Sequence, residues 1–355
     1  MLKVACIGTG GIIGAHMPGW EKSPDAEVVA GVDPNAEHLK AWGEKHGINR
    51  LHERVEDVLS DPEVDIVDIC TPNRFHAPLT VQALEAGKHV LCEKPLVPTV
   101  AEVRQIIDAR DKADRLVMTA QNFRFLDKSV ALKHLVDAGR LGEVYHSRAW
   151  WLRRGAIPTR PGFLLMEQAG GGPCIDLGVH VLDLTLHLLG HPKPVSVTGT
   201  AVTKLANKPG AWSEWGGKLE DPAAVDVEEF AAGMVRFDNG STLVLETSWM
   251  LHHPTRGNGD VAIWLYGDKA GAYFGDDSDV KILETDNDAN HFRDTIVRPM
   301  DTHLGGHAVE CIAFAKAVRE GAPSPVPPED SLAVIGVLDG LYQSSRAGRE
   351  VPVVL

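Results

Sequence analysis

The stretch that decides the fold is KVACIGTGGIIGAH, residues Lys3–His16, in which an apolar run breaks into clustered glycines. The pattern predicts a buried strand over Val4–Ile7, a tight turn at Gly8 and a helix after it. Gly10 allows the backbone to approach a ligand, and the free N–H groups of a helix N-terminus favour phosphate. The candidates for holding a dinucleotide in this stretch are Gly8, Gly10, Gly11, Ile12 and Ile13.

The spacing departs from the G-x-G-x-x-G fingerprint, because Ile13 occupies the third glycine position and Gly14 follows it. A second apolar strand, Glu27–Val32, ends in Asp33, where such folds place an acid on the ribose hydroxyls. A carboxylate there would repel a 2'-phosphate, so the sequence predicts NAD rather than NADP, which a comparison of kcat/KM for the two cofactors tests. The alternative is an ordinary glycine turn beside a solvated aspartate. The order of strand, turn, helix, strand and acid favours the dinucleotide.

Composition narrows the class of protein. At 355 residues the chain predicts two domains, and its net charge of −14 argues against a nucleic-acid partner. The five cysteines lack C-x-x-C spacing, which favours reduced core thiols over disulfides or zinc. No stretch is long and apolar enough for a membrane span, and strand-like sequence from Lys3 leaves no room for a signal peptide, so we expect a cytoplasmic protein without a membrane partner.

The fold class predicted is α/β with two domains. Strands alternate with helices up to about residue 121, which indicates a parallel Rossmann sheet over residues 1–121. Residues 122–355 contain longer strands with few helices between them, which favours a large, mainly antiparallel, open-faced sheet. Four helices are expected in this part, Asp127–Ala138, Pro173–Leu189, His303–Arg319 and Ser331–Arg346, and the final helix is allowed to pack back on the Rossmann domain.

Two motifs suggest chemistry. In Glu93-Lys94-Pro95, the proline biases Lys94 away from helix at the carboxyl end of a strand, the edge where ligands bind. After a triple glycine, Asp176 and His180 stand at i and i+4 near the start of a buried helix, on one face. This polar pair is either a satisfied core network or the acid and base that a dehydrogenase needs to remove a hydroxyl proton.

Together these motifs resemble the Gfo/Idh/MocA oxidoreductases, which include glucose-fructose oxidoreductase and inositol dehydrogenase. The resemblance rests on the glycine turn ending in His16, Thr71-Pro72-Asn73 with His76, Glu93-Lys94-Pro95, Arg124-Phe125 and Asp176-x-x-x-His180. It implies a Rossmann domain, then an open-faced domain whose sheet forms a homodimer or homotetramer. It also implies that Lys94, His180 and Asp176 are catalytic. The residues it places along the nicotinamide side are Thr71, Pro72, Asn73, His76, Glu93, Lys94, Gln121 and Asn122.

The sequence also suggests residues that contact the substrate. Trp151 and Arg153 belong to a loop whose indole and guanidinium groups suit a carbohydrate, although a strand end with solvated arginines explains them equally well. The full set of predicted substrate residues is Arg124, Trp151, Arg153, Asp176, His180 and His303. His252-His253 and His303 with His307 and Glu310 raise the question of a metal, but the spacing is weak and we expect none.

The resulting hypothesis is an NAD-dependent dehydrogenase that oxidises a secondary hydroxyl of a sugar, cyclitol or glycoside, with His180 as base and Lys94 assisting. The sequence leaves two alternatives open. One is an oxidoreductase that retains and recycles its cofactor while acting on glycosides or between two sugars. The other is a nucleotide-sensing regulatory protein on the same fold, for which the full set of Lys94, Asp176 and His180 would be unnecessary.

Overall fold

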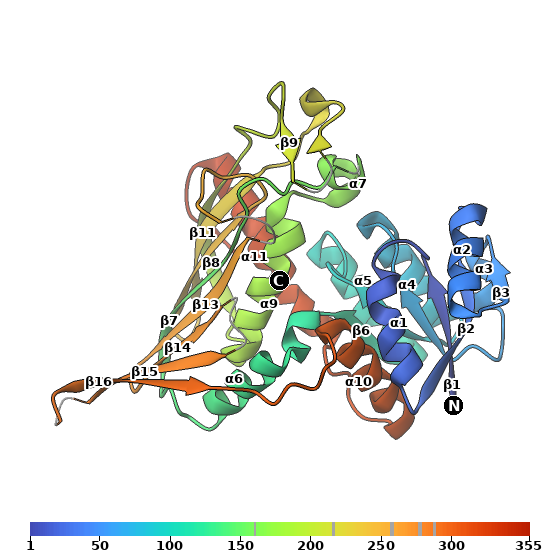
Figure 1. Cartoon of the computed structure of the whole chain (residues 1–355), viewed down its shortest axis with the longest axis horizontal. Coiled ribbons are helices and arrows are strands. Elements are labelled where there is room, and N and C mark those ends of the chain that lie inside the picture. The colour runs from blue at the N-terminus through green and yellow to red at the C-terminus, as the bar shows by residue number, and fades with distance from the viewer. Residues whose placement is uncertain (160, 215–216, 256–258, 276–278, 287–288) are drawn as a thin grey trace. The chain divides into compact units, whose positions relative to one another are not determined.

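The computed structural model describes residues 1–355 apart from 160, 215–216, 256–258, 276–278 and 287–288 (Figure 1). Its contacts divide the chain into two compact units. The first contains residues 1–125 and 303–332, and the second contains residues 126–302 and 333–355. Among the described residues, no helix combines the length and the apolar character that crossing a membrane requires.

The first unit is built on a parallel sheet of six strands in the order β3-β2-β1-β4-β5-β6, the doubly wound order of dinucleotide-binding folds. Strands β4 and β6 are fully buried, as expected for a sheet with helices on both faces. The strands are β1 (Leu2–Ile7), β2 (Ala26–Val32), β3 (Arg50–His52), β4 (Ile66–Ile69), β5 (His89–Glu93) and β6 (Val117–Ala120). The helices are α1 (Ile13–Lys22), α2 (Ala36–His46), α3 (Val55–Leu59), η1 (Asn73–Phe75), α4 (His76–Glu85), α5 (Val100–Ala113), η2 (Asn122–Phe125) and α10 (Gly306–Glu320).

Helix α10 belongs to the first unit, although the sequence analysis placed its residues in the second domain. It packs against α1, where a Cβ on Gly19 would lie 2.4 Å from the carbonyl oxygen of Ala308. Cys311 and Phe314 of α10 share a hydrophobic cluster with Trp20 of α1. The apolar face of α10 is thus buried against the Rossmann sheet and its first helix.

The second unit is built on a sheet of nine strands in the order β16-β15-β14-β13-β7-β12-β11-β8-β17. The sheet is mainly antiparallel, as predicted, with β7 and β12 as a parallel pair. Its strands are β7 (Val144–Leu152), β8 (Pro194–Val202), β11 (Phe230–Phe237), β12 (Thr242–Ser248), β13 (Asp260–Gly267), β14 (Gly271–Phe274), β15 (Val280–Asp286), β16 (His291–Val297) and β17 (Val351–Pro352), and a separate pair is β9 (Trp212–Ser213) with β10 (Gly217–Lys218). The helices are α6 (Asp127–Asp137), α7 (Pro161–Leu164), α8 (Met166–Ala169), η3 (Cys174–Gly178), α9 (Val179–Leu188), η4 (Pro222–Ala224) and α11 (Pro328–Ala347), within which the division between the units falls.

Side chains alternate across this sheet with the two-residue period of a strand. In β13, Ile263 and Leu265 are buried, whereas Trp264 and Tyr266 between and beyond them are partly exposed. Helix α9 packs on the same sheet, against β7 and β13 (Figure 1). The alternation in β7 turns Trp151 toward the same face as buried Ala149, and Arg148 and Trp150 toward the opposite face.

Candidate functional site

The turn after β1 has the geometry that a dinucleotide phosphate requires. Gly8 has a φ of +94°, and a Cβ there would lie 2.5 Å from the carbonyl oxygen of Cys70, so only glycine fits. A Cβ on Gly10 would have no atom within 4 Å, which leaves space above the turn. The N-cap of α1, Ile12, makes no side-chain hydrogen bond, so the first N–H groups of the helix are available to an anion.

Asp33 connects this turn to the end of β2. One carboxylate oxygen, Oδ2, accepts hydrogen bonds from the backbone N–H of Thr9 at 2.9 Å and from its hydroxyl at 3.2 Å. The other, Oδ1, accepts from the N–H of Asn35 at 2.8 Å. These bonds fix the orientation of Asp33, and a carboxylate still has lone pairs for ribose hydroxyls. The residues present therefore fit NAD.

The turns after β4 and β5 are joined by His76. Its ring is fully buried, with Nδ1 2.8 Å from the carbonyl oxygen of Pro95 and Nε2 2.8 Å from that of Thr71. Burial lowers the pKa of His76. Through these contacts the turn Thr71–Asn73 and the cis Lys94–Pro95 turn are held together, and Lys94 remains partly exposed at the sheet edge.

The segment after β6 carries three predicted site residues. Gln121 is 2 % exposed, and the side-chain amide of Asn122 lies 3.4 Å from Nδ1 of His307. Arg124 forms a 2.7 Å ion pair with Asp330 in which both side chains are largely shielded. The guanidinium predicted to touch substrate is therefore already paired within the first unit.

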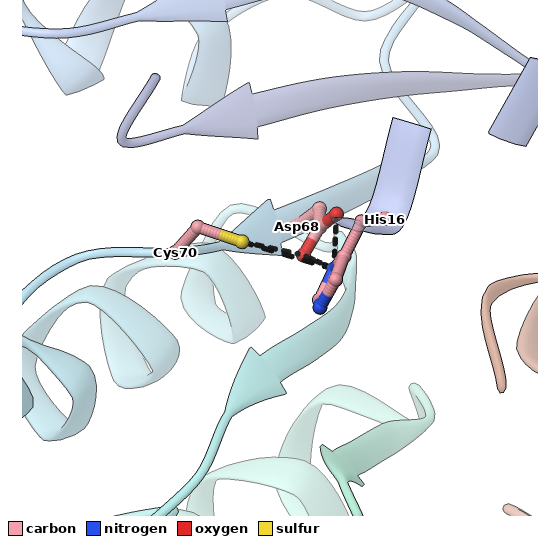
Figure 2. Close-up of side chains that lie close together, drawn as sticks. All are labelled: His16, Asp68 and Cys70. Atoms are coloured by element: carbon pink, nitrogen blue, oxygen red, sulfur yellow. Dashed lines mark hydrogen bonds and ion pairs between the residues drawn. The ribbon is translucent and has the colours of Figure 1, made fainter. Parts of the chain in front are cut away.

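A buried polar network beneath the glycine turn was not predicted as such. Figure 2 shows His16 of α1 pointing at Asp68 and Cys70 of the β4 region, whose ligand-type atoms all lie within 4.8 Å of one another. Asp68 accepts a 2.7 Å hydrogen bond from the indole of Trp20 and faces the His16 ring. Burial, together with Asp68, raises the pKa of the Cys70 thiol well above its usual range, and this thiol donates a 3.4 Å hydrogen bond to Asp68. We therefore interpret the group as a hydrogen-bonded network.

In the second unit the structure brings together four residues predicted to act on substrate. The ring of His180 lies 5.7 Å from that of Trp151, and the guanidinium of Arg153 lies 4.9 Å over the Trp151 indole. Burial lowers the pKa of Arg153 to about 10, although the charge of Asp176 opposes this shift. Arg153 and His180 are 6 % and 7 % exposed. An imidazole, a carboxylate, a guanidinium and an indole face thus share one cluster, in which Arg153 and His180 are buried and Trp151 and Asp176 are half-buried.

The start of the helical segment η3–α9, which carries Asp176 and His180, is held by residues that were not predicted. Asp176 lies in a π-helical turn, η3, rather than in the regular helix predicted, and π turns often occur at functional sites. Glu228, 5 % exposed, accepts hydrogen bonds from the N–H of Gly172 at 2.9 Å and of Cys174 at 3.0 Å. The indole of Trp249 donates to Asp176 at 3.1 Å. These contacts fix the carboxylate of Asp176.

Three further histidines were singled out from the sequence, His303 and the pair His252-His253. His303 is exposed, has a φ of +58°, and belongs to the first unit by its contacts, whereas the cluster belongs to the second. His252 is exposed and His253 is half-buried against Thr255. In the part of the chain that the structure describes, none of these histidines joins a group of three convergent metal-ligand atoms.

Comparison with known proteins gives a consistent result over most of the chain. Residues 2–121 match the family described as an oxidoreductase family with an NAD-binding Rossmann fold, and residues 129–273 match the GFO/IDH/MocA C-terminal domain. The chain is 32% identical over 353 residues to D-glucoside 3-dehydrogenase of Escherichia coli (strain K12), covering 99% of this chain and 97% of that protein. It is 26% identical over 349 residues to levoglucosan dehydrogenase of Pseudarthrobacter phenanthrenivorans, covering 91% and 88%. The fold matches that of a levoglucosan dehydrogenase in complex with NADH, with a TM-score of 0.86, 23% identity and 99% of each chain covered.

Proposed function

The chain belongs to the Gfo/Idh/MocA oxidoreductase family, and we propose that it is an NAD-dependent dehydrogenase that oxidises a secondary hydroxyl of a sugar, cyclitol or glycoside. The relatives named as glucoside and levoglucosan dehydrogenases support a carbohydrate substrate. The cluster of Trp151, Arg153, Asp176 and His180 is the observation that carries the proposal. An indole face packs on sugar C–H groups, and charged forks bind hydroxyls.

NAD, when bound, accepts a hydride from the carbon that carries the reacting hydroxyl. The α1 N-terminus and the glycine turn would hold the pyrophosphate. Asp33 would accept hydrogen bonds from the ribose hydroxyls. The turns at Thr71–Asn73 and Glu93–Lys94 would line the nicotinamide side together with Gln121 and Asn122.

Each catalytic residue has one task in this proposal. His180 receives the hydroxyl proton, a role suited to an imidazole near neutral pH. Asp176, held by the Trp249 indole, orients the substrate and His180. The ammonium of Lys94 stabilises negative charge that develops on the substrate oxygen.

The test of this assignment is the variant Lys94→Ala. We expect turnover to fall to background while the Kd for NAD stays within about threefold, because the lost ammonium acts on the oxygen rather than on the pyrophosphate. NADH formation against inositols, aldoses, anhydrosugars and glycosides gives the readout, and NAD released on denaturation shows whether cofactor is retained. Lys112→Ala, an exposed lysine on α5, is the control. Turnover retained by Lys94→Ala would refute the assignment.

We further propose a homo-oligomeric assembly and a cytoplasmic location. A homodimer or homotetramer forms through the open face of the nine-stranded sheet. The cytoplasm supplies NAD and keeps thiols reduced, which suits five buried cysteines without disulfides.

A further inference from the structure

His16 is a buried imidazole surrounded by carboxylates. Its Nδ1 lies 3.1 and 3.0 Å from the two oxygens of Asp68, and its Nε2 lies 2.9 Å from Oε1 of Glu93. Oε1 of Glu310 is 3.8 Å from the same Nε2. The side chains of His16, Asp68 and Glu310 are fully buried, and that of Glu93 is 6 % exposed.

Both ring nitrogens face carboxylate oxygens, which only accept hydrogen bonds when ionised. A neutral imidazole has one N–H, whereas the imidazolium has two, so this geometry fits the charged ring. Burial alone would raise the pKa of Glu93, but its hydrogen bond with His16 and the charges of His16 and Lys94 lower it to about 2. Burial alone would lower the pKa of His16, but the charge of Asp68 and its hydrogen bond to the ring raise the pKa well above the usual range.

The imidazole and the thiols that face His16 from other elements are uncharged at pH 7. His307 of α10 has its ring centroid 5.8 Å away, and its pKa is lowered to about 4 chiefly by burial, so it is neutral at pH 7. The thiols of Cys6, Cys70 and Cys311 have raised pKa values because they are buried, and stay protonated. Trp20 contributes an uncharged N–H to Asp68. Buried carboxylates without a cation beside them would be costly, which favours a proton on His16.

Glu93 links the His16 ring to the turn that follows β5. Its Oε1 contacts His16, and its Oε2 accepts a 2.9 Å hydrogen bond from the backbone N–H of Lys94. Because both oxygens are engaged, the side chain of Glu93 is fixed from two sides. The backbone from which the Lys94 side chain extends is therefore tied to the His16 ring.

We propose that His16 is a permanently protonated positioning residue, whose imidazolium holds Glu93 against the backbone of Lys94 and so orients that lysine for catalysis. The positioning role rests on the proposed function of Lys94, whereas the charge state of His16 does not. A displacement of about 1 Å at a reacting group can lower a rate about 100-fold, so a buried tether of this kind is able to affect turnover.

The charge state is tested in the wild-type protein by NMR of ¹⁵N-labelled histidine, with the His16 signals assigned by their loss in His16→Gln. We expect both His16 ring nitrogens to stay protonated from pH 6 to pH 9. A neutral His16 ring at pH 7 would overturn the proposal. If His16→Gln does not fold, side-chain correlations to the assigned backbone of the wild type identify the His16 ring instead.

Positioning is tested by steady-state kinetics and NAD binding of His16→Gln. We expect kcat to fall about 10- to 100-fold while the Kd for NAD stays within about threefold. Trp42→Leu removes bulk from the hydrophobic cluster that includes Trp20, and it leaves His16 and its carboxylates unchanged, so it serves as the control for lost stability. A fall in kcat equal to that of an equally destabilised Trp42→Leu, or a kcat unchanged in His16→Gln, would reject the positioning role. Turnover retained by Lys94→Ala would reject the proposed function and leave the NMR result standing.

Discussion

At the scale of single residues, Arg153 and Arg154 separate the two interpretations that the sequence left open for this loop. Arg153 is buried over the Trp151 indole beside Asp176, whereas Arg154 is exposed. Burial gives Arg153 a fixed position, which a solvated arginine at a strand end would lack. The interpretation of two solvated arginines therefore holds for Arg154 only.

We predict that Arg153→Ala raises the KM for the carbohydrate about 10- to 100-fold, because charge-assisted hydrogen bonds contribute about 1.5–3 kcal/mol. The KM for NAD should change little. Arg154→Ala is the matched control. Measured KM values for both substrates check this, and an unchanged carbohydrate KM in Arg153→Ala would remove the residue from the site.

His89 makes stability depend on pH. Burial and then the charge of Arg115 lower its pKa to about 4, and its Nδ1 accepts a 3.0 Å hydrogen bond from the N–H of Leu116, which requires an unprotonated nitrogen. In the unfolded chain the pKa of histidine is about 6.5, so the unfolded state binds the extra proton first. The stabilising contribution is complete above about pH 6.5 and is lost as the pH falls toward 4.

We predict that the free energy of unfolding of the wild type decreases from pH 6.5 to pH 4.5, and that His89→Asn flattens this slope. His307, whose pKa is also lowered to about 4, keeps part of it. Urea denaturation at several pH values measures the slope. A variant slope equal to that of the wild type would show that His89 is not a source of the pH dependence.

The residues of the site were predictable to different degrees. His180, Asp176 and Lys94 stand in short motifs with recognisable spacing, so they could be named in advance. Glu228 could not, because its role depends on long-range hydrogen bonds to Gly172 and Cys174 that leave no local pattern. Asp68 did carry a signal, since an acid inside the apolar strand Ile66–Ile69 requires a buried partner.

At the scale of elements, the strand-to-helix unit β1–α1 assigns different tasks to its two glycines. Gly8 needs its positive φ, and a Cβ placed on it would lie 2.5 Å from backbone, whereas a Cβ on Gly10 would meet nothing within 4 Å. Gly8 thus serves the fold of the turn. Gly10 keeps the space above it open to the cofactor.

We predict that Gly8→Ala lowers the stability of the protein by about 2 kcal/mol or more, because a side chain at positive φ is strained and here also clashes. Gly10→Ala should leave stability within about 0.5 kcal/mol of the wild type, yet weaken NAD binding. Thermal unfolding without NAD and NAD titration separate the two effects. Equal losses of stability in both variants would contradict this division of tasks.

Strands were missed where the hydrophobic pattern of the sequence was weakest. The two strands predicted around the glycine turn, Val4–Ile7 and Glu27–Val32, form, whereas β3 (Arg50–His52) is short and half-buried and was not predicted. β16 (His291–Val297) is mostly exposed at the edge of its sheet, so no apolar face marks it in the sequence. The parallel pairing of β7 with β12 was not predicted, because hydrophobic patterns define which residues are buried and not which strands are neighbours.

At the scale of the whole molecule, the nine-stranded sheet leaves an aromatic patch on the face opposite α9. The patch consists of Trp264, Tyr266 and Tyr273, all partly exposed. The ring centroids of Trp264 and Tyr273 are 4.6 Å apart, and those of Trp264 and Tyr266 are 6.1 Å apart. Clustered aromatic side chains on a broad flat face are typical of subunit interfaces.

We predict that Trp264→Glu converts the proposed homo-oligomer into smaller species, because a carboxylate at the centre of the aromatic patch would be buried without a partner. Trp212→Glu is the control, because it changes an indole that is 52% exposed and lies outside this sheet. The Trp212→Glu protein should have the same mass in solution as the wild type. Light scattering coupled to size-exclusion chromatography gives the masses, and circular dichroism verifies that each variant is folded. A folded Trp264→Glu protein with the mass of the wild type would show that subunits do not associate through this face, and a monomeric wild type would reject the oligomer altogether.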